Sequence, residues 1–159
     1  MTYVFILAGA VIALDQVTKA VALDHLALGV PLDVLPGWLS LTLVMNPGLA
    51  FGMLGSVPAA WRWVVALLSI VALAVLARVA IRVLPTGGWP GFVAVGLIFG
   101  GAVGNLIDRV RFGAVVDFVD LHWRGYHWPA FNVADSAISV GVALLALRLL
   151  STRSASSSA

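Results

Sequence analysis

The sequence contains no cysteine and no glutamate, and charged residues of all kinds make up only 10% of it. The absence of cysteine excludes a disulfide framework, a thiolate zinc site and a cysteine nucleophile. The low charge excludes an intrinsically disordered chain, which combines high charge with low hydrophobicity. Every side-chain carboxylate is one of seven aspartates, so any acid–base chemistry is confined to a few positions.

Apolar residues are abundant instead, at 62% of 159 residues, whereas a soluble domain has about 45–50%. The length fits one compact unit. Nine lysine and arginine residues give a net charge of only +2 and are scattered along the chain. Nucleic acid is therefore not an expected partner, because its binding needs a concentrated basic surface.

Four segments are long and apolar enough to cross a membrane, which takes about 20 residues of helix. They are residues 3–23, 63–84, 92–109 and 133–150. The alternative for each is a core helix of a soluble protein, but so short a chain has too little polar surface to cover four such helices. We therefore predict a membrane all-α fold with four transmembrane helices, in one domain over residues 1–150.

The ends of the chain carry weaker signals. Ala20-Val21-Ala22 matches the small-residue pattern of a cleavable signal peptide, but there is no basic stretch before the first span, and Asp15 and Lys19 interrupt its end. We expect a retained span. Four spans place both termini on one side, which we take as cytoplasmic, although the lysine and arginine count does not settle the orientation. The serine-rich residues 151–159 predict a disordered cytoplasmic tail.

The connection between the first two spans predicts a small β ribbon over about residues 38–54. Residues 38–43 alternate apolar and polar side chains, as a half-buried strand does. Asn46-Pro47-Gly48 suits a type II turn, and residues 49–54 can return as a second strand. We expect an extracytoplasmic β cradle on the membrane surface, whose apolar side dips into lipid or covers another part of the protein; the alternative is an unstructured loop.

Three glycines in the third span, Gly96, Gly100 and Gly104, recur every four residues and line one helix face. Such a face permits close contact between helices. Room for a substrate is the alternative, and packing is the favoured interpretation.

Charged residues inside an apolar span cost about 2.5–3.5 kcal/mol or more, so each needs a partner or a chemical role. Asp15 and Lys19 are spaced i, i+4 and predict a structural ion pair on one helix face. Asn105 and Asp108 share a face at the end of the third span, and Arg109 follows them. The last two fit either a network at the helix end or a site that positions a substrate.

Asp117 and Asp135 are the candidate catalytic residues. Asp117 lies among apolar residues just beyond the third span, and Asp135 lies at the start of the fourth. If these spans pack side by side, the two carboxyl groups can share one proton. One then acts as general base on a water and the other as general acid. The alternatives are a favourable anion at a helix N-terminus for Asp135 and a surface acid for Asp117.

Other chemistry has less support. Asp120, His122 and His127 do not have the spacing of a known metal-ligand motif. The nearby aromatic residues Trp123, Tyr126 and Trp128 are typical of a membrane interface. No metal and no cofactor are expected.

Four sequence blocks together resemble the lipoprotein signal peptidases, the signal peptidase II family. In chain order they are Asp15-Gln16-Val17-Thr18-Lys19, Asn46-Pro47-Gly48-Leu49-Ala50-Phe51-Gly52, the stretch 100–109 with Val116-Asp117-Phe118, and Phe131-Asn132-Val133-Ala134-Asp135-Ser136-Ala137-Ile138. The resemblance covers about residues 3–150. It is least diagnostic between Arg111 and Ala130.

The resemblance implies an aspartic endopeptidase of the bacterial inner membrane with its active site near the extracytoplasmic face. It implies a prolipoprotein substrate whose cysteine carries diacylglycerol, cut just before that cysteine. The family's catalytic aspartates fall on Asp117 and Asp135. Its other polar residues fall on Asn46, Asn105, Arg109 and Asn132, as candidate substrate-binding residues, and on Asp15, Lys19 and Asp108, as supporting residues. Membrane lipid is the other expected partner, and one copy of the chain suffices.

Two other functions are compatible with apolar spans. A small proton-coupled transporter would use intramembrane acids as a relay, but it should spread them through the membrane depth, and all except Asp15 map to one interface. A membrane scaffold packed through the glycine face would leave Asp117 and Asp135 without a role.

Overall fold

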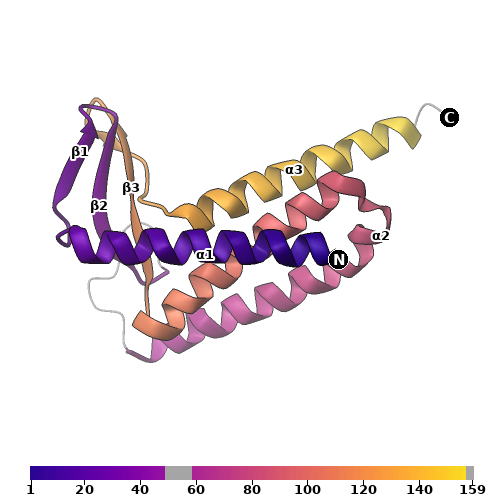
Figure 1. Cartoon of the computed structure of the whole chain (residues 1–159), viewed down its shortest axis with the longest axis horizontal. Coiled ribbons are helices and arrows are strands. Elements are labelled where there is room, and N and C mark those ends of the chain that lie inside the picture. The colour runs from indigo at the N-terminus through magenta and orange to yellow at the C-terminus, as the bar shows by residue number, and fades with distance from the viewer. Residues whose placement is uncertain (49–58, 157–159) are drawn as a thin grey trace.

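The computed structural model describes residues 1–48 and 59–156. Within these residues, three helices and four strands follow one another (Figure 1). They are α1 (Thr2–His25), β1 (Pro31–Leu35), β2 (Leu39–Asn46), α2 (Ala59–Phe112), β3 (Val115–Trp123), β4 (Tyr126–His127) and α3 (Val133–Ser156).

Helix α2 consists of two arms joined at Gly88, whose backbone dihedral angles, φ 52° and ψ −167°, are not helical. A positive φ is readily adopted by glycine, and the sequence places this residue between two prolines. Figure 1 shows the two arms running in opposite directions, so α2 supplies both the second and the third of the predicted spans.

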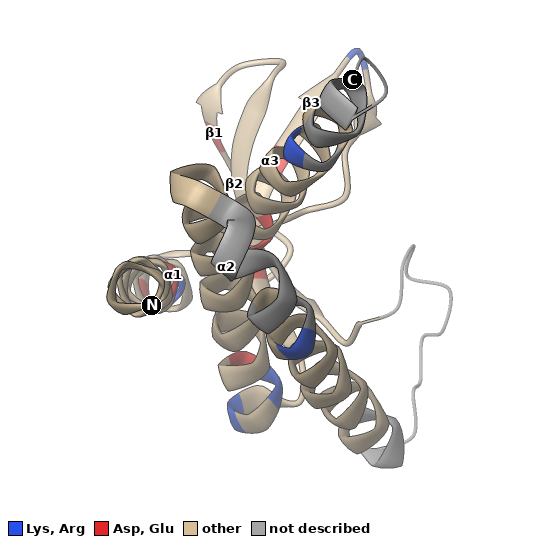
Figure 2. Cartoon of the chain, turned by 90° about the vertical axis from the view of Figure 1, so that its right-hand side faces the viewer, with Lys and Arg blue, Asp and Glu red and all other residues tan. Residues whose placement is uncertain are grey.

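All four predicted spans are helical, but their lengths and hydropathy differ. Within the described residues, two helices are long and apolar enough to cross a membrane, Thr2–His25 and Gly88–Phe112, and Trp63–Arg78 is a shorter apolar helix. The number of membrane crossings therefore stays a prediction. Figure 2, which colours the ribbon by residue type, shows few charged positions on the described parts of the helices, as lipid contact requires.

Helix α3 extends to Ser156, so residues 151–156 of the predicted disordered tail are helical. Residues 157–159 lie outside the described part of the chain. The sequence after Gly141 contains no glycine or proline. Helix propagation adds one backbone hydrogen bond per residue, so nothing in this stretch stops the helix at residue 150.

The strands form one antiparallel sheet in the order β1-β2-β3-β4. Residues 39–43 of the predicted strand lie in β2, whereas Trp38 belongs to the preceding turn. Gly48 has the positive φ of 90° that the predicted turn needs. The predicted return strand, residues 49–54, lies outside the described residues. The strands found beside β2 are β1 and β3, neither of which belongs to the predicted ribbon.

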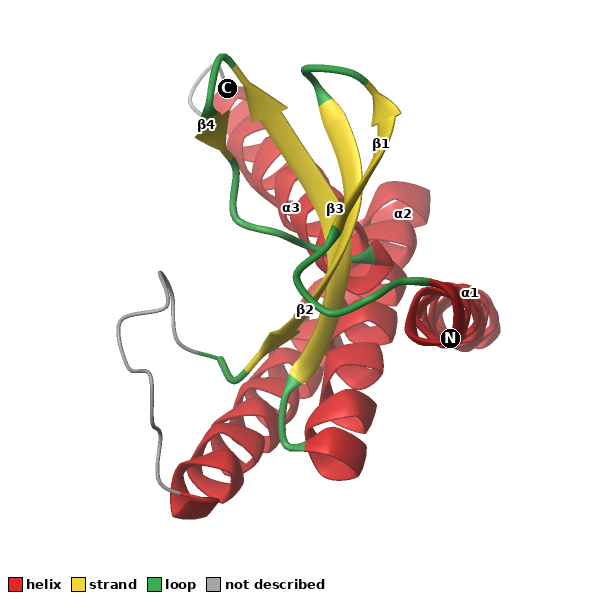
Figure 3. Cartoon of the chain, turned by 90° about the vertical axis from the view of Figure 1, so that its left-hand side faces the viewer, coloured by secondary structure: helices red, strands yellow, loops and turns green. Residues whose placement is uncertain are grey.

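The sheet lies across one end of the helices, at the last turn of α1 and the first turn of α3 (Figures 1 and 3). Strand β3 directly follows α2, and its first residues, Val115 and Val116, are buried. The sheet is therefore held at its base by the helices, while its other end extends sideways beyond them.

The glycine face of the third span packs against α1. A Cβ atom on Gly100 would lie 2.8 Å from the backbone oxygen of Ala8, and one on Gly104 would lie 2.6 Å from Oδ2 of Asp15. Real Cβ atoms do not approach other atoms so closely. The packing interpretation is thus supported, and Gly104 gives Asp15 the space it occupies.

We expect Gly104→Ala to lower the free energy of unfolding by about 1–3 kcal/mol, the usual cost of overpacking, because the new methyl group must displace the Asp15 carboxylate. Gly9→Ala is the matched control, since a Cβ there meets nothing within 4 Å. Thermal unfolding in detergent should give a lower Tm for Gly104→Ala only. Equal Tm values for both variants would contradict this packing.

Candidate active site

Asp117 is buried in β3, where it pairs with Val44 of β2, and only 1% of it is exposed. Both oxygens of its carboxylate accept hydrogen bonds from amide side chains. Asn46 Nδ2, at the end of β2, donates to Oδ2 over 2.9 Å, and Asn132 Nδ2 donates to Oδ1 over 2.7 Å. The surface-acid alternative for Asp117 is therefore wrong, because the sheet and the helices enclose its side chain.

Asp135 lies in the first turn of α3, and Asn132 immediately precedes that helix. The Asp135 backbone N–H donates to Asn132 Oδ1 over 2.9 Å, and the Asn132 backbone N–H donates to Asp135 Oδ2 over 3.3 Å. This reciprocal pair is a capping box, which satisfies free N–H groups at a helix start. Asp135 is therefore a helix N-terminal anion, as one alternative proposed, and the same bonds fix the direction of its carboxylate.

Asn132 connects the two candidate catalytic residues, since it donates its side-chain amide to Asp117 and its backbone amide to Asp135. A third amide, Asn105 Nδ2 on the second arm of α2, donates to Asp135 Oδ1 over 2.7 Å. Asn132 Nδ2 also lies 3.2 Å from Asn105 Oδ1. The predicted meeting of the third and fourth spans thus gathers both aspartates around one asparagine.

The pKa of Asp117 is raised to about 6, mainly by burial and also by the nearby charge of Asp135. The hydrogen bonds from Asn46 and Asn132 and the charge of Lys19 oppose this rise. A carboxyl group with this pKa can hold a proton close to neutral pH. Such a group is suited to proton transfer, since acid–base catalysis works best when the pKa lies near the working pH.

A buried ion cluster lies beneath this pair. Lys19 Nζ is 2.8 Å from Asp15 Oδ2, which confirms the geometry of the predicted i, i+4 pair. Lys19 Nζ is also 2.7 Å from Asp108 Oδ2 and donates to Asn105 Oδ1 over 3.0 Å. All three charged residues are almost fully buried. The bond from Lys19 orients the Asn105 amide so that its nitrogen faces Asp135.

The same cluster fixes the backbone just before each candidate catalytic residue. Asp15 Oδ1 accepts the N–H of Ala134, over 2.9 Å. Asp108 Oδ2 accepts the N–H of Val116, over 3.1 Å. Asp15 and Asp108 therefore position Asp135 and Asp117, respectively. Asp108 takes part in a network at the helix end, which is one of the two roles considered for it.

Gln16 also belongs to this cluster, although it is not among the predicted site residues. Its Nε2 lies 3.0 Å from Asp108 Oδ1 and 3.2 Å from Asp15 Oδ2, so its amide joins two carboxylates that Lys19 also bridges. The one feature of the sequence that points to Gln16 is its position beside Asp15 in the family-like block Asp15–Lys19.

The Arg109 guanidinium interacts electrostatically with the carboxylates of Asp135, Asp108 and Asp117. Its Nη1 donates to the backbone oxygen of Asn105 over 3.2 Å. Its buried Nε has no hydrogen-bond partner among the described residues. The guanidinium therefore keeps donor capacity beside the aspartate pair.

Among the described residues, no group of three or more histidine, cysteine, aspartate or glutamate side chains could hold a metal ion. The arrangement around Asn132 combines two carboxyl groups, one of raised pKa, with amide and guanidinium donors. These groups can activate a water, donate a proton and bind a polarised carbonyl oxygen.

Comparison with known proteins gives a consistent result over most of the chain. The family model described as signal peptidase (SPase) II matches residues 7–151. A lipoprotein signal peptidase of Syntrophotalea carbinolica is 48% identical over 142 residues, which cover 89% of this chain and 87% of that protein. One from Geobacter sulfurreducens is 47% identical over 139 residues, covering 87% and 86%.

The fold gives the same result. A solved structure described as a bacterial membrane enzyme superposes with a TM-score of 0.76 and 34% identity, covering 94% of each chain. The sequence matches and this fold likeness each span far more than half of the chain. The protein is a membrane protease of the signal peptidase II family, the lipoprotein signal peptidases.

Proposed function

We propose that this protein is an aspartic endopeptidase that removes the signal peptide from diacylglyceryl-modified prolipoproteins by cutting before the lipidated cysteine. The family membership supports the substrate class. The observation that carries the mechanism is the junction at Asn132, which hydrogen-bonds both Asp117 and Asp135. The charge of Asp135 also raises the pKa of Asp117, and two carboxyl groups that interact in this way favour a state in which they share a single proton.

In this mechanism, the ionised aspartate takes a proton from a water as the water oxygen attacks the scissile carbonyl carbon. The protonated aspartate donates its proton to the carbonyl oxygen, which gives a neutral tetrahedral intermediate. The C–N bond then breaks as one hydroxyl proton returns to an aspartate and the other aspartate protonates the leaving amine. The pair ends with one proton, as it began, and needs no cofactor.

Arg109 is the proposed donor to the substrate carbonyl, because its buried Nε has no hydrogen-bond partner among the described residues and it lies beside the aspartates. Such a donor stabilises the charge that develops on that oxygen. Asn46, Asn105 and Asn132 already donate to the two carboxylates. We propose that these three asparagines contribute to substrate binding indirectly. They hold the two carboxylates in place where the peptide bond must lie.

We further propose four membrane crossings in the bacterial inner membrane, cytoplasmic termini and an active site at the extracytoplasmic face. The sheet and the aspartate pair lie together at one end of the helices (Figure 3). Water can reach the site from that side, and the substrate's acyl chains can lie along apolar helix surfaces. One copy of the chain suffices. A transporter is not favoured, because the matched relatives are peptidases.

The test is to incubate the purified protein with a diacylglyceryl-modified prolipoprotein and with its unmodified twin, and to weigh the products by mass spectrometry. We expect a signal peptide that ends at the residue before the cysteine, from the modified substrate only. Equal cleavage of both substrates would contradict the proposed specificity. No cleavage of either, by a folded protein, would contradict the activity.

The shared proton predicts a pH dependence. Asp117, with a pKa of about 6, holds its proton below that pH and loses it above. The doubly ionised pair has no acid, so kcat/KM should fall as the pH rises through about 6. Asn46→Ala removes a hydrogen bond that lowers the Asp117 pKa, so the falling limb should move to higher pH. A limb that stays in place, or moves to lower pH, would contradict this assignment.

A further inference from the structure

The asparagine at the end of β2 is held by the glycine two residues after it. The Gly48 backbone N–H donates to Asn46 Oδ1 over 2.9 Å, and Asn46 Nδ2 donates to Asp117 Oδ2 over 2.9 Å. A backbone N–H can only donate, so it fixes the oxygen of the Asn46 amide on its own side and the nitrogen on the side of Asp117. Pro47 has no N–H, so Gly48 provides the first backbone donor after Asn46.

The other two asparagines of the candidate site are held in the same way. Asn105 Oδ1 accepts from Lys19 Nζ over 3.0 Å, while its nitrogen donates to Asp135. Asn132 Oδ1 accepts from the backbone N–H of Asp135 over 2.9 Å, while its nitrogen donates to Asp117. In each case a separate donor holds the amide oxygen, so that the nitrogen faces a carboxylate. A flipped amide would place its oxygen against that carboxylate, where two acceptors repel each other.

Two features of residue 48 disfavour a side chain there. Its φ is 90°, a value that residues with a Cβ atom rarely adopt. A Cβ atom on it would also lie 2.8 Å from Cγ1 of Val65, on the first arm of α2, which is closer than real Cβ atoms approach other atoms. A side chain at residue 48 would therefore rotate or displace its backbone, and with it the N–H that Asn46 accepts.

We propose that Gly48 is a positioning residue for the cleavage reaction, because its N–H keeps the Asn46 amide in the orientation that donates to Asp117. This inference rests on the proposed function, in which Asp117 is one of the two acid–base groups. The pKa of Asp117 is raised to about 6, mainly by burial, and the Asn46 hydrogen bond opposes this rise. Without the Gly48 contact, the amide is free to turn its oxygen toward Asp117, where a protonated carboxyl group can donate to it. The Asp117 pKa should then rise.

Charged groups on three helices also lie around this part of the site. They are Lys19 on α1, Asp108 and Arg109 on α2, and Asp135 on α3. Gly48→Ala leaves all of these side chains unchanged. A shift of the Asp117 pKa in this variant therefore reports on the contact between Gly48 and Asn46.

The test compares the pH dependence of kcat/KM for a lipid-modified prolipoprotein in the wild type, Gly48→Ala, Asn46→Ala and the double variant. We expect the falling limb to move to higher pH in Gly48→Ala, by about half a pH unit or more, as the loss of one hydrogen bond allows. The double variant should have the limb of Asn46→Ala alone, because the glycine acts through the asparagine. A glycine that only shapes the turn would lower kcat at every pH and leave the limb in place, which would overturn the proposal.

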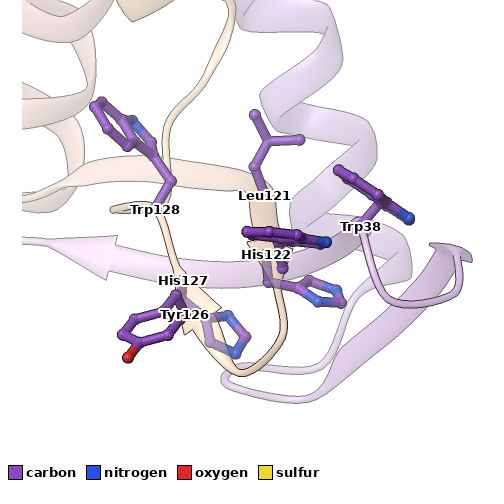
Figure 4. Close-up of a pocket in the computed structure, with 7 residues that line it drawn as sticks. Trp38, Leu121, His122, Tyr126, His127 and Trp128 are labelled. Atoms are coloured by element: carbon purple, nitrogen blue, oxygen red, sulfur yellow. The ribbon is translucent and has the colours of Figure 1, made fainter.

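Gly37→Ala is the matched control, since Gly37 also has a positive φ, of 81°, and a Cβ atom there meets nothing within 4 Å. Gly37 directly precedes Trp38, which lines a hollow at the other end of β2 from Asn46 (Figure 4). Its limb should stay at the wild-type pH, and an equal shift in both glycine variants would contradict the inference. An inactive wild type would contradict the proposed function itself, whereas an active Gly48→Ala with an unmoved limb contradicts only the role of Gly48.

Should Gly48→Ala fail to fold, hydrogen exchange of the Gly48 amide decides the question without a glycine variant. Gly48 is exposed, so the bond to Asn46 Oδ1 is what slows the exchange of its N–H. NMR in detergent should show exchange about fivefold faster or more in Asn46→Ala than in the wild type, as the loss of one hydrogen bond allows. Equal exchange rates in the two proteins would overturn the proposal.

Discussion

Replacing either Asp117 or Asp135 by asparagine is expected to lower kcat for prolipoprotein cleavage by about a thousandfold or more. Each variant removes one partner of the shared-proton pair, and general acid–base groups of this kind contribute about 10²–10⁴-fold each. Asparagine has nearly the shape of aspartate, so the protein should still insert and fold. Cleavage of a lipid-modified substrate in detergent, followed by mass spectrometry, measures the loss.

Asp24→Asn is the matched control for these two variants. Asp24 is also an acid at the sheet end of a helix, but its side chain is 81% exposed and it belongs to neither the aspartate pair nor the ion cluster. Its activity should stay within a few-fold of the wild type. Normal turnover by Asp117→Asn or Asp135→Asn would contradict the mechanism, and a complete loss in Asp24→Asn would show that the site is misplaced.

Lys19→Met should destabilise the fold strongly, by about 3–5 kcal/mol, the range observed when one partner of a buried ion pair is removed. Without the ammonium group, the buried carboxylates of Asp15 and Asp108 lose their shared cation. Those carboxylates hold the backbone before Asp135 and Asp117, so activity should fall together with stability. Thermal unfolding in detergent and the cleavage assay measure the two effects.

Arg111→Met is the matched control for Lys19→Met, because it also removes one cation. Arg111 Nη1 donates to Gln16 Oε1, but the arginine side chain is exposed. Exposed charge pairs contribute about 0–1 kcal/mol, so its Tm should change little. A Lys19→Met protein with the Tm of the wild type would show that the ion cluster does not hold the helices and the sheet together.

The helices of this fold were predictable because their signal is local. Each predicted span is a mostly apolar run, and the prolines and glycines around Gly88 mark the reversal between the arms of α2. The ends were less predictable. Helix α3 continues to Ser156 since nothing in the serine-rich stretch interrupts its backbone hydrogen bonds.

The sheet was only partly predictable because strand pairing joins residues far apart in the sequence. The alternation at residues 38–43 predicts one strand of the pair, but β3 comes from beyond α2 and begins with four buried residues, Val115 to Phe118, so it shows no alternation between an inward and an outward face. Strand β1 is exposed along its whole length and also lacks alternation. Composition within each segment could not show that either one lies beside β2.

The residues of the candidate site were easier to predict than the hydrogen bonds that join them. Charges within apolar runs single out Asp15, Lys19 and Asp108, while Asp117 lies among apolar residues just beyond the third span and Asp135 at the start of the fourth. Neither periodicity nor charge shows that Asn132 bonds to both aspartates, or that Gln16 bridges two carboxylates. These bonds depend on the packing of α1, α2, α3 and β3 against one another.

The most direct test of the aspartate pair is the pKa of Asp117 in the wild type and in Asp135→Asn, measured by carbon-13 NMR on protein with labelled aspartate carboxyl groups. Asp117→Asn identifies the Asp117 signal among the seven aspartates. Since the charge of Asp135 raises the Asp117 pKa, the account predicts a lower Asp117 pKa in Asp135→Asn than in the wild type. An identical pKa in both proteins would contradict a shared site, because it would mean that neither carboxyl group senses the charge of the other.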